Sequence, residues 1–112
     1  MKLPNAELAL IETEKIRDYL LSASHPIGRF KAPVFEAMGY SQDRWERLAA
    51  DLREQHAFSE VDEVVESQHG RKYILRANLK GPNGRTFAMQ SIWIVLKGED
   101  VPRFVTAYPG EE

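Results

Sequence analysis

The chain has 112 residues, of which 43% are hydrophobic and 29% charged, with a formal net charge of −2. This length and composition suit one domain with one core, and the net charge argues against whole-molecule steering toward nucleic acid. The absence of cysteine excludes disulfides and thiolate zinc sites and fits a reducing cytoplasm, where we expect the protein. Neither a membrane-length apolar run nor a signal peptide is visible.

The first 58 residues predict three helices, over about 13–22, 28–38 and 42–55. In each of them apolar residues recur at helical spacing and form one buried stripe. The stripes comprise Ile16, Tyr19 and Leu20; Phe30, Val34, Phe35 and Met38; and Trp45, Leu48, Ala49 and Leu52. Gly39 suits the left-handed residue that ends a helix. The short apolar run 8–11 fits either a strand or a helix start.

From residue 61 the apolar period changes to two, which predicts strands over about 61–67, 72–79, 86–96 and 103–109. Short links between them, including the turn Gly81-Pro82-Asn83-Gly84, indicate an antiparallel meander. The third strand is apolar on both faces around Trp93, so we expect it to be central.

In the last strand, regular alternation puts Phe104, Thr106 and Tyr108 on one face. The chain is therefore predicted to be one α+β domain, residues 1–112. Its helical part, 1–58, supplies three N-terminal helices that pack on a four-stranded antiparallel meander sheet, 59–109.

Among the three histidines, His25 is the candidate functional residue. It precedes a proline at the start of a predicted helix, with Arg29 and Lys31 close behind, where backbone N–H groups favour an anion. The alternative is that Ser24 and His25 only cap the helix. His56 and His69 are expected to be exposed turn residues.

His25 and Lys31 together with Thr106 and Tyr108 match the needs of RNA cleavage without a metal. That reaction needs a base for the ribose 2′-proton, an acid for the leaving 5′-oxygen, and donors for charge on phosphorus. No spacing indicates metal ligands or a nucleotide loop, so we expect no metal and no cofactor. Arg76 is predicted to join these four residues in one cleft between the second helix and the sheet.

Several segments resemble a bacterial domain family of unknown function. They are Leu3-Pro4-Asn5-Ala6, Tyr19-Leu20-Leu21-Ser22, Ser24-His25-Pro26-Ile27-Gly28-Arg29-Phe30-Lys31-Ala32, Gly81-Pro82-Asn83-Gly84-Arg85-Thr86, Trp93-Ile94-Val95 and Pro102-Arg103-Phe104-Val105-Thr106-Ala107-Tyr108-Pro109. More distantly, helices that lead into a four-stranded antiparallel sheet with a closing Thr-x-Tyr strand resemble the barnase–EndoU–colicin–RelE superfamily. Many members of that superfamily are small ribonuclease toxins.

The superfamily resemblance implies roles for individual residues. His25 would be the general base or acid, Lys31 would bind the phosphate, and Thr106 and Tyr108 would position or stabilise it. Because a second well-placed histidine is lacking, Tyr108, Lys31 or Arg76 would take the second proton transfer. Arg29 and Arg76 are the expected substrate-binding residues.

We therefore expect a metal-independent endoribonuclease that forms a 2′,3′-cyclic phosphate and acts as the toxin of a toxin–antitoxin pair. Its expected partners are RNA and a cognate antitoxin or immunity protein, with no membrane and no DNA. The sequence leaves open a non-catalytic anion- or protein-binding module of such a conflict system. The acidic block 51–66 would support a third alternative, an immunity-type partner.

Overall fold

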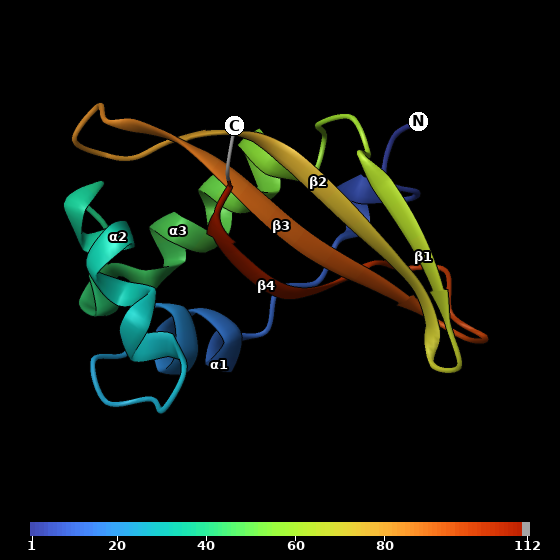
Figure 1. Cartoon of the computed structure of the whole chain (residues 1–112), viewed down its shortest axis with the longest axis horizontal. Helices are drawn as coiled ribbons and strands as arrows, with labels where there is room; N and C mark the ends of the chain where they lie inside the picture. Colours follow the sequence, from blue (N-terminus) through green and yellow to red (C-terminus); the bar gives the residue numbers. More distant parts are fainter. Residues whose placement is uncertain (111–112) are drawn as a thin grey trace.

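In the computed structural model, which describes residues 1–110, helices fill the first half of the chain and a four-stranded antiparallel sheet fills the second (Figure 1). The helices lie against one face of the sheet, which gives two layers around one core. The predicted α+β class is therefore confirmed. None of the helices within residues 1–110 has the length and apolarity needed to cross a bilayer.

Three helical regions lie where the apolar spacing predicts them, although each consists of short segments. They are α1 (Thr13–Lys15) with a π-helical continuation (Ile16–Leu20), a 3-10 turn (Gly28–Phe30) followed by α2 (Ala32–Ala37), and a 3-10 turn (Gln42–Arg44) followed by α3 (Trp45–Asp51) and a second π-helical segment (Leu52–His56). Gly39 ends the second region at φ +98°, a backbone conformation that glycine adopts without strain. The run 8–11 is neither a strand nor a helix start: Leu8 ends a 3-10 turn (Ala6–Leu8), and Leu10 makes a single bridge to Arg103.

The sheet has the order β1-β2-β3-β4, in which consecutive strands pair antiparallel. Its strands are β1 (Glu63–Ser67), β2 (Gly70–Lys80), β3 (Thr86–Leu96) and β4 (Arg103–Pro109). β3 is interior, as its apolar composition predicts, whereas β1 and β4 are edge strands. The first strand begins at Glu63, two residues later than predicted, and the backbone N–H of Val61 bonds to the carbonyl of Met1.

The core forms between the helices and the inward face of β2, β3 and β4. Trp93 is fully buried there, with its ring edge-on to Phe104 at 5.3 Å between centroids. Of the predicted core residues, Phe35, Leu48, Leu52 and Trp93 are buried, and Val34 and Trp45 are half-buried.

Phe30 does not belong to the core, and its predicted burial is wrong. Its side chain is 71% exposed and carries the Arg29 guanidinium 4.8 Å above its ring. The second helical region begins as a 3-10 turn, in which side chains repeat every three residues instead of 3.6. Residue 30 therefore leaves the stripe that α-helical spacing would give it.

A bulge in β4 changes which side chains face the core. Thr106 pairs with Ile92 and Phe104 pairs with Trp93, so the intervening Val105 has no partner in β3. The extra residue brings Phe104 and the next inward residue, Ala107, both to the core. Thr106 and Tyr108 share the opposite face, as predicted, but Phe104 does not share it with them.

Not every residue of the acidic block 51–66 lies on the surface. Asp51 is only 5% exposed, accepts a hydrogen bond of 2.7 Å from the Tyr40 hydroxyl and pairs with Arg47 at 3.0 Å. Burial, followed by the Asp51 carboxylate, raises the pKa of Tyr40 above its usual value. Asp51 therefore stabilises the interior and offers no surface charge to a partner.

His56 is also buried, so its predicted exposure is wrong. Its Nε2 lies 3.1 Å from the carbonyl oxygen of Ala77 and 3.0 Å from that of Met89, so Nε2 carries a proton and donates. Its Nδ1 accepts from the Ser91 hydroxyl at 2.5 Å, and Ser91 in turn accepts from the Trp93 indole at 2.8 Å. Because His56 and Ser91 are fully buried, this serine–histidine pair is structural and not a nucleophile with its base.

Replacing Trp93 with alanine should cost about 3–5 kcal/mol of unfolding free energy, because a large buried ring leaves a cavity. Chemical denaturation would measure this loss. Trp45→Ala is the matched control and should cost less, because Trp45 is half-buried. Equal losses for the two variants would contradict the assigned core.

Acidification should destabilise the protein through His56. Burial lowers the pKa of His56 below its usual 6.5, although its bonds to Ala77 and Met89 oppose this shift. The unfolded chain therefore binds the proton more readily, and stability falls as pH drops below about 6.5. His56→Gln should flatten this slope in denaturation measured at several pH values. His69→Gln, in the exposed β1–β2 turn, should keep the wild-type slope, and an unchanged slope in His56→Gln would refute the assignment.

Candidate functional site

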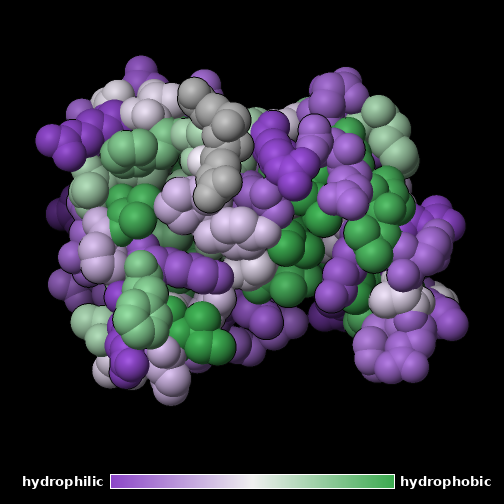
Figure 2. All heavy atoms as spheres, in the orientation of Figure 1, coloured by the Kyte–Doolittle hydropathy of each residue, from purple (hydrophilic) through white to green (hydrophobic). Residues whose placement is uncertain are grey.

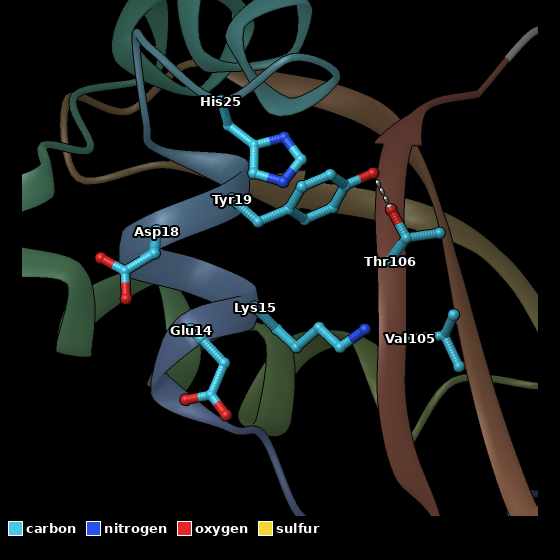
Figure 3. Close-up of a pocket in the computed structure, with 7 residues that line it drawn as sticks. All are labelled: Glu14, Lys15, Asp18, Tyr19, His25, Val105 and Thr106. Atoms are coloured by element: carbon cyan, nitrogen blue, oxygen red, sulfur yellow. Dashed lines mark hydrogen bonds between the residues drawn. The ribbon is translucent and has the colours of Figure 1, made fainter.

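A pocket of about 530 Å³ lies between the first helical region and the edge strand β4 (Figure 3). The side chains that line it are Glu14, Lys15, Asp18, Tyr19, His25, Val105 and Thr106. Two of the predicted site residues, His25 and Thr106, are therefore in its wall. The bulged residue Val105 forms part of the same wall, so the irregularity of β4 lies at the pocket.

Lys31 joins the helical layer to β4 through two hydroxyl groups. Its Nζ donates to the Tyr19 oxygen at 2.5 Å and to the Thr106 Oγ1 at 2.8 Å, and the two hydroxyls lie 3.2 Å apart. The same ammonium lies 4.8 Å from the Tyr19 ring centroid and 5.5 Å from that of Tyr108. Tyr19, near the start of the chain, and Thr106 and Tyr108, near its end, therefore meet around the Lys31 ammonium.

The Tyr19 phenol is electrostatically activated by these contacts. Burial alone would raise its pKa, but the hydrogen bonds with Lys31 and Thr106 and the charges of Lys31 and Lys15 together lower the pKa below 10.0. A phenol with a lowered pKa releases and accepts a proton closer to neutral pH. Such perturbed groups in clefts are candidates for acid–base chemistry.

His25 lies beside Tyr19 and also organises the loop that carries it. Its Nδ1 accepts hydrogen bonds of 3.0 Å from the backbone N–H groups of Ile27 and Gly28. The neutral ring therefore carries its proton on Nε2, at the edge that points toward the Tyr19 ring in Figure 3. The two ring centroids are 4.9 Å apart in a T-shaped arrangement. The capping alternative from the sequence thus describes Nδ1, while Nε2–H faces the Tyr19 ring and makes no hydrogen bond within residues 1–110.

Gly28 is what allows this loop to lie against the helix. A Cβ atom at residue 28 would lie 1.7 Å from the carbonyl oxygen of Tyr19, which is a severe clash with backbone. Only glycine therefore lets residues 25–28 approach the helix closely enough for His25 to meet Tyr19.

Arg76 and Tyr108 lie on the open face of the sheet, outside the lining of the pocket. Arg76 donates to Gln90 Oε1 at 2.9 Å and pairs with Asp62, while Gln90 donates to the Tyr108 hydroxyl. The register therefore places Arg76 on the face of Thr106 and Tyr108, but its guanidinium is occupied by a carboxylate. Arg29 remains apart from this group, over the ring of Phe30.

Tyr19 and Lys15 are site residues that the sequence reasoning missed. Tyr19 fits the apolar stripe of its helix, and its neighbours Ile16 and Leu20 are indeed fully buried. The signal that could have found it is a phenol within an otherwise aliphatic stripe, with a lysine four residues earlier on the same helix face. Within residues 1–110, no three His, Cys, Asp or Glu side chains are grouped as metal ligands.

Comparison with known proteins gives a family and a fold. No curated protein matches the chain. A chain from a solved structure, described as a contact-dependent growth inhibition toxin–immunity protein complex from Klebsiella pneumoniae 342, is similar with a TM-score of 0.67 and 18% identity over 96% of this chain and 97% of that chain. This likeness shows a shared fold. A family model described as a domain of unknown function matches residues 2–111, so the protein belongs to the DUF6883 family.

Proposed function

We propose that the protein is a metal-independent endoribonuclease of a bacterial toxin system. The observation that carries this proposal is the Tyr19 phenol, whose pKa is lowered at the wall of an open pocket and which is bonded to Lys31 and Thr106. A phenol and an ammonium at one position supply a base and a phosphate-binding cation, the two groups that cleavage of RNA needs first.

In the proposed reaction, Tyr19 takes the proton of the ribose 2′-hydroxyl and the 2′-oxygen attacks phosphorus. The bond from phosphorus to the 5′-oxygen breaks, which leaves a 2′,3′-cyclic phosphate and a 5′-hydroxyl. Lys31 and Thr106 stabilise the charge on the phosphoryl oxygens. Tyr108 supplies the leaving-group proton, because Gln90 donates to its oxygen and leaves its own O–H free.

His25 has a binding role in this scheme. Its Nδ1 lone pair is occupied by two backbone N–H groups, so the ring offers a donor at Nε2 and no base. We assign Nε2–H to a phosphate oxygen, which replaces the proton-transfer role that the superfamily resemblance implies for His25.

The toxin-system part of the proposal is supported by the similar Klebsiella structure, whose description names a toxin and its immunity protein. We propose that this chain likewise works with a cognate immunity protein or antitoxin, which would keep the ribonuclease inactive in the cell that makes it.

Purified protein should cleave total RNA in the presence of EDTA and leave 2′,3′-cyclic phosphate ends. Tyr19→Phe should reduce the rate by about 10²-fold or more, because general base catalysis contributes roughly 10²–10⁴-fold. Lys31→Met should also be impaired, whereas Lys97→Met, in the exposed β3–β4 link, is the matched control and should retain activity. Full activity of folded Tyr19→Phe would refute the mechanism, and absence of cleavage by the wild type would refute the function.

The pH dependence tests the role of Tyr19 independently. Because the base must be deprotonated, the rate should rise with pH and level off below pH 10.0, at the lowered pKa of Tyr19. Lys31→Met should move this break to higher pH, because the variant removes the charge and hydrogen bond that lower the pKa. A break that stays in place in Lys31→Met would exclude Tyr19 as the base.

The open face of the sheet supports a second candidate, a non-catalytic protein-binding module. Val65, which is 40% exposed, shares this face with the half-buried Ile74, Ile92 and Ile94. Figure 2 looks onto this face and shows hydrophobic side chains gathered over the sheet between hydrophilic ones. If the wild type leaves RNA intact and binds a partner protein through these residues, this candidate replaces the ribonuclease.

A further inference from the structure

Lys15 is a cation in the wall of the pocket, and helix geometry explains its position. Lys15 and Tyr19 are four residues apart and lie on one face of the helical region, whereas Glu14 and Asp18 lie on the adjacent face. In Figure 3 the Lys15 side chain extends toward β4 near Val105, while the Glu14 and Asp18 carboxylates point away from that strand. The side of the pocket between the helix and β4 is therefore cationic.

Within residues 1–110, no carboxylate forms a salt bridge with the Lys15 ammonium, and the nearby Asp18 is held by Arg17 at 2.9 Å. Lys31 differs, because its hydrogen bonds go to the Tyr19 and Thr106 hydroxyls. Lys15 is half-buried, lines the pocket and has no described counter-ion, so its ammonium is free to pair with an anion there.

We propose that Lys15 binds the phosphate next to the scissile one, so that the substrate is a single RNA strand that spans at least two phosphates of the site. This inference rests on the proposed function, which puts the scissile phosphate at Lys31 and Tyr19. Lys15 and Tyr19 are four residues apart, about one turn of the helical region, and both line the pocket, so they can contact different phosphates of one strand. The Glu14 carboxylate points away from β4 and repels the strand, which confines the strand to the Lys15 side.

Binding of an uncleavable ligand tests this inference apart from catalysis. The probe is a fluorescent 2′-O-methyl RNA hexamer, which lacks the attacking hydroxyl, and its affinity is measured by anisotropy over a range of salt concentrations. Each phosphate contact to a single strand contributes about −0.7 to the slope of log K against log salt. Lys15→Met should therefore make the slope shallower by about 0.7, while Lys97→Met should keep the wild-type slope.

A dinucleotide with one phosphodiester separates the two phosphate positions. Its affinity should be unaffected in Lys15→Met and reduced in Lys31→Met. An unchanged hexamer slope in Lys15→Met, an equal loss with the dinucleotide, or no binding of the hexamer by the wild type would each overturn the inference. Lys15-dependent hexamer binding without cleavage of unmodified RNA would refute the ribonuclease and leave this binding position standing. Cleavage of unmodified RNA by the wild type, together with an unchanged hexamer slope in Lys15→Met, would refute this binding position and leave the ribonuclease standing.

Discussion

The bulge at Val105 is the constraint on which the rest of the structure depends. β4 must give Phe104 and Ala107 to the core beside Trp93 and also present Thr106 and Tyr108 on the opposite face. A regular strand cannot do both, because its side chains alternate strictly. One unpaired residue resolves the conflict, and that residue lies in the wall of the pocket. The same irregularity therefore completes the core and shapes the candidate site.

The Tyr19–Lys31–Thr106 cluster is unusual in being polar, half-buried and free of carboxylates. Other cations of the described residues form ion pairs with a carboxylate, as Arg47 does with Asp51. Lys31 is instead held by oxygen atoms of neutral side chains, which orient its charge without cancelling it. This arrangement costs some desolvation, which the hydrogen bonds offset. In a purely structural cluster, a carboxylate beside Lys31 would add a stabilising ion pair. In a binding site for an anion, the same carboxylate would repel the ligand.

The fold could be predicted from the sequence where spacing and turn chemistry agreed, whereas the candidate site could be predicted only in part. Three helical stripes and the four strands could be predicted because their apolar periods are long enough to be unambiguous. The burial of Phe30 was predicted wrongly because a 3-10 turn changes the period of the side chains without changing the residue types. The bulge at Val105 could not be predicted because it contains no glycine. Burial of His56 depends on partners 21 to 35 residues away, which local sequence cannot reveal. Tyr19 could not be recognised as a candidate site residue because a tyrosine fits the buried stripe of a helix as well as a functional site.

The distance along the chain between Lys31 and Thr106 has a consequence for biosynthesis. Their hydrogen bond joins residues 75 apart, and Tyr19 is 87 residues from the same hydroxyl. A ribosome releases the chain from its N-terminus, so the helical half emerges well before the strand that completes the cluster. A nascent or truncated polypeptide that lacks β4 carries the lysine and the phenol but no assembled centre. The cluster of Tyr19, Lys31 and Thr106 is therefore complete only after β4 has been synthesised.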